Sequence, residues 1–366
     1  MLMEVYWPIL AASPNNFDLL EASLAFLFGH NVPHCSLTKN PNLHSNNLKN
    51  RNMMRKILFF VCAALALTAC QKKAPENNQG ETEKSVQPKV YGRYVPERKD
   101  DFAWENEYAA FRMYGPALKP ENPSNGVDLW LKKSPELIVD SFYYREHVLG
   151  LPYHINYGKG LDCYKVGHTC GAGGLVVMVD DDPEDRIYVG GPYDRWEILE
   201  QTPDKFVFKL EYDSLEVFGH ILHESITITA EAGHMLNRAD VVLSGQMPYE
   251  GKMWVGGGIC VHDSVENIYT CDNCGIAAYA EDALSDKTAA KMNYEYNGST
   301  SQGRAYTAVM IPNGASIKVQ DGVLYAVRPY NLGDTLTYFF GACWSEWSNG
   351  ELSFPTDQAW FDGIQL

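Results

Sequence analysis

Apolar and polar residues alternate with a period of two along most of the chain that follows Lys89. The clearest segments are 205–212 (KFVFKLEY) and 223–231 (HESITITAE). A period of two turns alternate side chains to opposite faces, which is the pattern of a half-buried β-strand. Gly, Pro and Asp clusters bound many further short segments of this kind, among them 127–132, 175–179, 239–244, 253–261, 276–280, 306–311 and 336–342.

Helical patterns are rare, because only 135–148 and 356–364 show one. Residues 102–114 and 186–189 are also expected to be extended. No repeat of fixed period is visible, which argues against a propeller or a solenoid. Many strands with short turns are buried most economically in two packed layers. The sequence therefore predicts an all-β fold, a large antiparallel β-sandwich that forms a single domain over 89–366.

The N-terminal part of the chain has the layout of an export signal. Met54-Arg55-Lys56 is basic, 57–67 is an uncharged apolar run, and Leu67-Thr68-Ala69 precedes Cys70. A basic start, a short apolar run and small residues are typical of a secretory signal peptide, and the run is too short to span a bilayer. The last four residues resemble the lipobox of bacterial lipoproteins. We expect 54–69 to be a lipoprotein signal peptide, Cys70 to be lipidated, and 1–53 to be a mis-annotated upstream extension.

Residues 70–88 are polar and charged, so they are expected to form a flexible tether between the lipid and the domain. Five Lys or Arg and three Asp or Glu lie before Cys70, so the remaining chain has 25 basic and 43 acidic residues and a net charge of −18. Such a surface repels phosphate backbones, which makes nucleic acid a poor partner. The expected location is a bacterial membrane surface outside the cytoplasm, either the periplasmic face or the outer-membrane surface.

Six cysteines follow the lipidation site, and an exported protein is permitted disulfides. Cys271-Asp-Asn-Cys274 has the CxxC spacing, but no second half-site follows at zinc-finger distance. A local disulfide or two free thiols are therefore favoured over a metal ion. The pairing of the others is left open: Cys163, Cys170, Cys260 and Cys343.

One segment, 153–175, is rich in both glycine and titratable side chains. Glycine is used where the backbone adopts positive φ or where another group approaches closely. A rigid loop that presents convergent polar groups is typical of a small-molecule site, although a long hydrogen-bonded connection would have a similar composition. The candidate catalytic residues in this segment are His154, Tyr157, Asp162 and Lys165.

Two motifs resemble the bacterial lipoprotein family catalogued as domain of unknown function 4861. These are 98–107 (RKDDFAWENE) followed by 111–116 (FRMYGP), and 157–167 (YGKGLDCYKVG). The resemblance extends over essentially all of 89–366. It implies a galactose-mutarotase-like β-supersandwich and a setting among polysaccharide-degrading proteins, without a settled reaction.

In that setting His154, Tyr157 or His168 is a candidate for proton transfer, and Lys159 and Lys165 are candidate cations for developing negative charge. This set suits β-elimination at a uronic acid. Hydrolysis needs two carboxylates on either side of the scissile bond, for which Asp162 with Glu346 or Glu105 are candidates. Residues predicted to bind substrate are Arg98, Asp101, Trp104, Lys159, Tyr164, His168, His262, Trp344 and Glu346.

Each of these residues also has a structural interpretation. Arg98 with Asp101 is equally consistent with a salt bridge at a strand entrance, and Trp104 must alternate with Glu105 between two faces, of which one is core. The sequence predicts no metal and no cofactor. It favours an exported enzyme acting on uronate-containing oligosaccharides, a lyase slightly ahead of a glycoside hydrolase. A glycan-binding lipoprotein without catalysis and a sugar epimerase or mutarotase are the alternatives.

Overall fold

The computed structural model describes residues 87–121, 126–180, 182, 186–247, 251–262, 265–283 and 302–364. All of these belong to a compact unit over Glu83–Leu366. The predicted upstream extension, the signal peptide with Cys70 and most of the tether lie outside the described residues. Within the described ranges, no helix has the length and apolar character that crossing a membrane requires.

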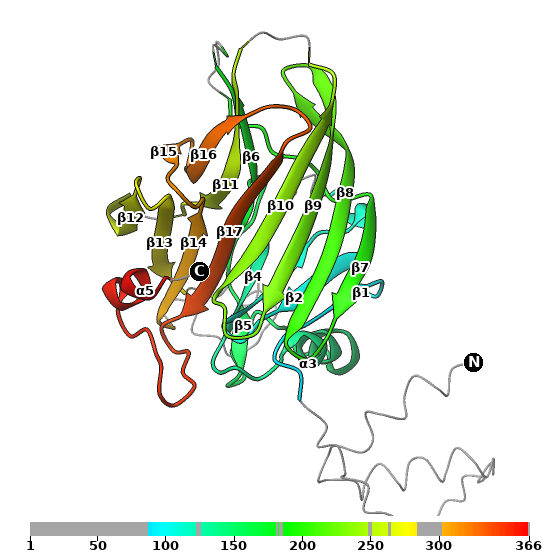
Figure 1. Ribbon diagram of the computed structural model, residues 1–366. Coiled ribbons are helices and arrows are strands. Elements are labelled where there is room, and N and C mark those ends of the chain that lie inside the picture. Colours follow the sequence, from blue (N-terminus) through cyan, green and yellow to red (C-terminus); the bar gives the residue numbers. More distant parts are fainter. Residues whose placement is uncertain are drawn as a thin grey trace, which may run out of the picture. The chain divides into compact units, whose positions relative to one another are not determined.

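The described residues form three antiparallel sheets (Figure 1). The largest has eight strands, in the order β12 (Ile268–Cys271), β13 (Ile276–Asp282), β14 (Arg304–Met310), β17 (Thr335–Trp344), β10 (Leu236–Gly245), β9 (His220–Glu231), β8 (Lys205–Val217) and β7 (Arg195–Gln201). A five-stranded sheet runs in chain order through β1 (Tyr91–Val95), β2 (Asp101–Glu105), β3 (Ala109–Met113), β4 (Asp128–Lys132) and β5 (Gly160–Asp162). The third sheet has the order β15 (Ser316–Gln320), β16 (Val323–Tyr330), β11 (Met253–Cys260) and β6 (Ala172–Val179).

The eight-stranded sheet packs against both smaller sheets, so the prediction of an all-β antiparallel sandwich is confirmed. Strands β8 and β17 contact the five-stranded sheet, while β13, β14 and β17 contact the four-stranded one. The interface is aromatic. Trp104 of β2, for example, stacks on Phe111 with ring centroids 5.4 Å apart and lies 5.0 Å from the ring of Phe208. Rings in offset or tilted contact stabilise a core beyond their buried area.

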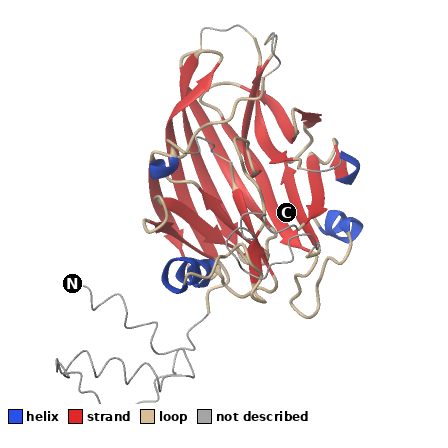
Figure 2. Ribbon diagram, turned by 180° about the vertical axis from the view of Figure 1, so that it is seen from behind, coloured by secondary structure: helices blue, strands red, loops and turns tan. Residues whose placement is uncertain are grey.

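The few helices lie at the periphery of the strands (Figure 2). The predicted helix at 135–148 is present as α3 (Val139–Tyr144), which continues as one π-helical turn, η3 (Arg145–Leu149). The predicted C-terminal helix is α5 (Asp357–Gly363), whose first turn is capped by the side chain of Thr356. Two short 3₁₀ turns, η2 (Pro116–Leu118) and η4 (Val265–Asn267), complete the set among the described residues.

Two of the predicted strands differ from the structure. Residues 102–114 form the hairpin β2–β3, because the side chain of Asn106 accepts hydrogen bonds from the backbone N–H groups of Tyr108 and Ala109 and so turns the chain. Residues 186–189 form no strand, and only an isolated bridge joins Tyr188 to Val177.

The outer face of the five-stranded sheet, which points away from the eight-stranded sheet, is polar and yet buried. α3 and the loop that follows it cover this face, and Phe142 and Tyr143 of α3 pack on Trp130 of β4. The carboxylate of Glu105 accepts hydrogen bonds from the backbone N–H groups of Ile138 and Val139 at the start of α3. A carboxylate at this end of a helix is favoured, because the first N–H groups have no partner within the helix.

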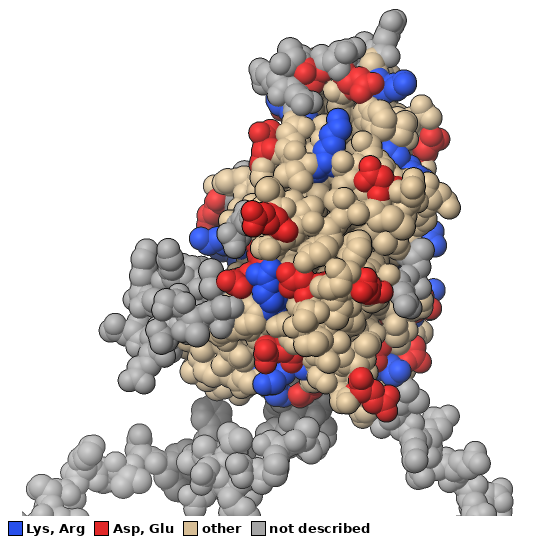
Figure 3. Space-filling model, turned by 90° about the vertical axis from the view of Figure 1, so that its left-hand side faces the viewer, with Lys and Arg blue, Asp and Glu red and all other residues tan. Residues whose placement is uncertain are grey.

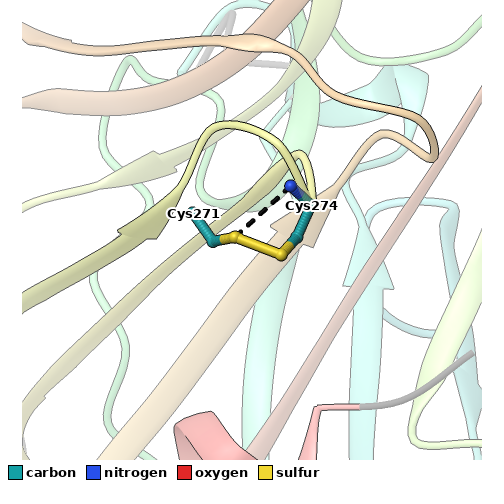
Figure 4. Close-up of a disulfide and its surroundings, with 2 residues drawn as sticks. All are labelled: Cys271 and Cys274. Carbon is teal, nitrogen blue, oxygen red and sulfur yellow. Dashed lines mark hydrogen bonds between the residues drawn. A yellow bond between two sulfur atoms is a disulfide. The ribbon is translucent and has the colours of Figure 1, made fainter.

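Cys271 and Cys274 form a disulfide across the turn between β12 and β13 (Figure 4). Of the two states that the CxxC spacing left open, the structure has the disulfide. The backbone N–H of Cys274 also donates to the Cys271 sulfur at 3.3 Å. The remaining described cysteines are free thiols: Cys163, Cys170, Cys260 and Cys343.

Candidate active site

A buried arginine with three aspartates around it occupies the outer face of the five-stranded sheet. Arg112 points to this face because its neighbours on β3, Phe111 and Met113, fill the core between the sheets. Its Nη2 contacts Asp128 of β4 and lies 3.3 Å from Oδ2 of Asp162 on β5, and its Nε lies 3.8 Å from Oδ2 of Asp101 on β2. Three strands thus bring carboxylates to one guanidinium. We call these four residues the Arg112 cluster.

Aromatic rings surround the guanidinium of Arg112. Its Cζ lies 5.2 Å from the ring centroid of Trp130, 5.4 Å from that of Tyr114 and 5.5 Å from that of Tyr153. Cations over aromatic faces are stabilised electrostatically, and more so away from water. Burial has the largest single effect and opposes the charge of Arg112, but Asp128, Asp162 and the neighbouring tyrosines together keep the pKa of the guanidinium above its ordinary value.

Asp162 is the member of the cluster best suited to carry a proton. Burial, and then the negative charge of Asp128, raise the pKa of the Asp162 carboxyl to about 7, against the opposing effects of His154, Arg112 and Arg98. The Nε1–H of Trp130 donates to its Oδ2 at 3.0 Å. A carboxyl that exchanges its proton near neutral pH is what general acid–base chemistry requires.

His154 lies in the loop after η3, against the Arg112 cluster. Its Nδ1 is 3.2 Å from the backbone oxygen of Asp162 and 3.7 Å from Oδ2 of the same residue. A carbonyl oxygen only accepts, so Nδ1 carries the hydrogen and Nε2 of the neutral ring keeps its lone pair. The His154 side chain is 33% exposed, in contrast to 4% for Asp162. Among the groups of the site, His154 is therefore the base that a substrate can reach.

Arg98 is the cation at the accessible edge of the cluster. It precedes β2, its Nη1 lies 3.0 Å from Oδ2 of Asp101, and its side chain is 22% exposed. Its Cζ lies 5.4 Å from the Tyr114 ring centroid, so Arg98 and Arg112 share that ring. Arg98 and Arg112 both lie against Asp101, so the two arginines are joined by this carboxylate as well as by the Tyr114 ring.

Among the described residues, five polar atoms of this site are buried without a hydrogen-bond partner, namely Oδ2 of Asp101, Nε of Arg112, both carboxylate oxygens of Asp128 and the hydroxyl of Tyr143. Two of them, Oδ2 of Asp101 and Oδ2 of Asp128, are in ion pairs with arginine. Buried polar atoms are nearly always paired with protein, ordered water or a ligand. The site therefore has hydrogen-bonding capacity to spare at its centre. The described ranges contain no group of three His, Cys, Asp or Glu side chains placed to hold a metal ion.

The structure brings together four of the residues that the sequence singled out, namely Arg98, Asp101, His154 and Asp162. The predicted lysines lie elsewhere. Lys159 forms an ion pair with Glu136 on the surface, and Lys165 is exposed. Tyr157 is also exposed, with the guanidinium of Arg145 5.2 Å from its ring centroid. The positive charge at the cluster is carried by arginines.

Three predicted sugar contacts are interior residues, which corrects the expectation that they line a rim. Trp104 has no exposed surface, because β2 turns it into the core while Glu105 faces outward. Tyr164 is buried and its hydroxyl donates to the backbone oxygens of Gly171 and Cys260. Trp344 is 1% exposed and its Nε1–H donates to the Gln302 carbonyl.

The remaining predicted contacts occupy other places. Glu346 is exposed in the turn after β17. Nδ1 of His262 lies 2.8 Å from Oε2 of Glu281, and its Nε2 lies 2.5 Å from the backbone oxygen of Lys165. Burial opposes its charge, but hydrogen bonding to Cys260 and Glu281 raises the pKa of His262 to about 10. This imidazole is a fixed cation that holds the 163–170 segment. His168 lines a separate cavity, described below.

The glycines of 153–175 serve the packing of the chain. Gly171 has φ +64 and pairs in parallel with Val127, and a Cβ there would overlap the Val127 carbonyl oxygen. Gly160 has φ +149, and a Cβ there would overlap the Leu131 carbonyl oxygen. At both positions the group that approaches the glycine closely is protein backbone, as in a long hydrogen-bonded connection. Their effect on the site is indirect, because they set the course of β5 and hence of Asp162.

Arg112, Asp128 and Trp130 were not singled out from the sequence. The available signal was one charged residue inside an otherwise apolar strand, as in Ala-Ala-Phe-Arg112-Met and Val-Asp128-Leu-Trp-Leu. Charged side chains are almost never fully buried unless they are paired, so such a strand indicates a buried ion pair or a site.

Comparison with known proteins gives a family without an assigned reaction. A family model described as "Domain of unknown function (DUF4861)" matches residues 56–365. "Uncharacterized protein P7" of Formosa agariphila is 27% identical over 290 residues, which cover 75% of this chain and 66% of that protein. The match thus spans just under two thirds of the relative's own length.

Two solved structures share a distant likeness. One is the GH36 alpha-galactosidase AgaB from Geobacillus stearothermophilus, with 9% identity and a TM-score of 0.34 over 69% of this chain and 41% of that enzyme. The other is a putative kojibiose phosphorylase from the human microbiome, with 8% identity and a TM-score of 0.34 over 76% of this chain and 36% of that one. Similarity at this level does not establish a shared activity.

Proposed function

The chain belongs to the family described as domain of unknown function DUF4861, and from that premise we propose that it is an enzyme acting on uronate-containing oligosaccharides by β-elimination. The observation that carries the proposal is that an accessible base and an accessible cation lie on two aspartates of the Arg112 cluster, His154 on Asp162 and Arg98 on Asp101. His154 is anchored through Nδ1 on Asp162, and Arg98 lies at the edge of the same cluster. The polysaccharide-degrading setting that the family resemblance implies supports a saccharide as the substrate.

The proposed reaction begins with the uronate carboxylate against Arg98. A guanidinium matches a carboxylate in shape and charge, and it stabilises the negative charge that develops when the neighbouring C5–H bond breaks. Nε2 of His154 takes the C5 proton, and the carboxyl group of Asp162 beside Nδ1 stabilises the imidazolium that forms. The C4=C5 double bond forms as the C4–O bond breaks. His154 then returns its proton to the leaving oxygen, so the step needs no co-reactant.

The arrangement of the aspartates favours elimination over hydrolysis. A glycosidase places its two carboxyl groups on either side of the scissile bond, with room for the sugar between them. Here the carboxylates of Asp128 and Asp162 both contact Nη2 of Arg112, and their side chains are 1% and 4% exposed. Arg112 occupies the space that a glycosidase leaves for substrate. The two aspartates compensate the buried charge of Arg112 and do not contact the substrate.

The experiment that tests this function is incubation of the full chain with a panel of uronate oligosaccharides. Elimination produces an unsaturated uronate, which absorbs in the ultraviolet, and the absorbance should be absent with His154→Ala. New reducing ends without this absorbance would show hydrolysis and overturn the proposed reaction. Binding without either product would show a capture protein and overturn catalysis.

We also propose that the chain is exported and anchored to a membrane through a lipid on Cys70. The support is the basic start, apolar run and lipobox-like residues that precede this cysteine. Expression with a labelled fatty acid should label the wild type and leave Cys70→Ser unlabelled and released into the soluble fraction. Equal labelling of both proteins would exclude this anchor.

A further inference from the structure

A concave site lies away from the Arg112 cluster. It is a cavity of about 380 Å³ lined by residues from four separate segments of the chain, namely Lys119, His168, Val189–Pro192, and Ser214 with Glu216. Ligand-binding pockets begin at roughly 300 Å³, so this one is large enough for one or two sugar rings. Its walls are built by η2, the 163–170 segment, the loop before β7 and an irregular part of β8.

Three polar side chains of this cavity, those of His168, Ser214 and Glu216, are free to bind a ligand. β8 changes register against β9 between Tyr212 and Leu215, and the irregularity turns Ser214 outward next to Glu216. Among the described residues, neither of these side chains has a hydrogen-bond partner, nor does that of His168. The cavity therefore offers a hydroxyl, a carboxylate and an imidazole, which together donate and accept hydrogen bonds.

The charges of the lining favour a neutral ligand. Lys119 forms an ion pair with Asp194, whose other carboxylate oxygen accepts a hydrogen bond from the Asp213 backbone N–H at 2.8 Å. The lysine charge is thus neutralised by a fixed partner. Glu216 then adds an uncompensated negative charge, which would repel a phosphate or a carboxylate. The rest of the lining is apolar or bare backbone, from Val189, Gly190–Gly191 and Pro192.

A lining that combines apolar surface with a mixed set of donors and acceptors matches a pyranose, which has C–H surface on its ring and hydroxyls at its rim. We infer that this cavity is a binding site for a neutral saccharide unit, distinct from the Arg112 cluster. The two sites are neighbours through Tyr193, which follows the cavity wall at Pro192 and whose hydroxyl donates to the backbone oxygen of Asp100, next to Asp101. The inference goes beyond the proposed function, because it requires only the cavity and its lining.

The test uses ligand-observed NMR to measure binding of the full chain to neutral methyl pyranosides of galactose, glucose, xylose and rhamnose. Ser214→Tyr fills the mouth of the cavity from an exposed position, and we expect it to weaken binding at least tenfold. Ser244→Tyr makes the same change at an exposed position of β10 and should leave binding unchanged. Glu216→Gln keeps the size of the side chain but removes the charge, and neutral sugars should still bind to it.

Three results would overturn the inference. They are the absence of binding by every neutral sugar of the panel, equal binding by Ser214→Tyr and the wild type, and tighter binding of glucuronate or inorganic phosphate than of neutral sugars. His154→Ala separates the two proposals. It should abolish turnover of uronate oligosaccharides and keep the neutral-sugar affinity within about twofold, which corresponds to about 0.4 kcal/mol.

Discussion

Nζ of Lys132 lies 2.8 Å from Oε2 of Glu105, and neither side chain has any exposed surface. The same carboxylate caps the start of α3, and Nζ also donates to the Asn106 backbone oxygen at 2.7 Å. This ion pair therefore connects the outer face of the five-stranded sheet to the helix that covers it. The Arg112 cluster lies on the same face. The helix α3, which covers this face, is therefore held to the sheet by the buried ion pair.

Replacing one partner of this pair should destabilise the protein strongly. Lys132→Met leaves the Glu105 carboxylate buried without a counter-ion, and the loss of one partner of a buried pair costs about 3–5 kcal/mol. Urea denaturation followed by circular dichroism measures the free energy of unfolding. The matched control is Lys133→Met at the adjacent exposed position, where the change should stay within about 0.5 kcal/mol. Similar losses for the two variants would show that the pair is not structurally important.

Activity should depend on His154 and not on Lys165. His154→Ala removes the accessible base, and loss of a general base typically lowers turnover about 10²- to 10⁴-fold. Lys165 is exposed and touches His262 only through its backbone oxygen, so Lys165→Ala should retain most of the activity. Kinetics and thermal melting of both variants make the comparison, with melting temperatures near that of the wild type. Loss of activity in Lys165→Ala would place the reaction elsewhere.

Stability should fall as the pH rises toward neutrality, because of Asp162. The pKa of this carboxyl is raised from an ordinary 3.8 to about 7 in the folded protein, by burial and by Asp128. Between these values the folded state binds more protons than the unfolded chain, so the free energy of unfolding decreases with rising pH. The contribution is complete below about pH 4 and is lost as the pH passes about 7.

Asp162→Asn should remove this component of the pH dependence. Urea denaturation at several pH values between about 4 and 8 measures the slope for both proteins. Asp204→Asn, at an exposed position in the turn before β8, serves as the control and should keep the wild-type slope. If Asp162→Asn has the wild-type slope, another group is responsible for the proton uptake.

The disulfide between Cys271 and Cys274 should be recovered by peptide mapping of the alkylated protein without reduction. Cys163, Cys170, Cys260 and Cys343 should be alkylated, and the last three only after unfolding because they are buried. The loop closed by the disulfide is very short, so its loss in a Cys271→Ser, Cys274→Ser double variant should cost about 2 kcal/mol or less. Alkylation of Cys271 in the unreduced protein would show that the bond is absent.

The sequence predicted the architecture well, because period-two alternation is set locally by which face of a strand is buried. The same rule identified two faces at Trp104 and Glu105 but not which face was core. That choice depends on which side the eight-stranded sheet packs, and it is made by contacts with Phe208 and Phe340, more than a hundred residues further along the chain.

The candidate site was predicted only in part, for a similar reason. Polar residues in loops or beside glycines are recognisable as site candidates from sequence, and this identified Arg98, Asp101, His154 and Asp162. Arg112 and Asp128 lie inside apolar strands, and their pairing depends on the register of β3 against β4, which places them directly opposite each other. The prediction gave Lys159 and Lys165 a role in the site that they do not have. The number of cations in a segment does not show in which direction each side chain points.

The division of the site between strands and loop has a consequence for substitutions. Asp101, Arg112, Asp128 and Asp162 are fixed by the register of four strands, whereas His154 and Arg98 sit on connections beside them. Substitution of His154 or Arg98 therefore alters the accessible groups and leaves the strand register intact, whereas substitution of an inner charge leaves its buried partners uncompensated.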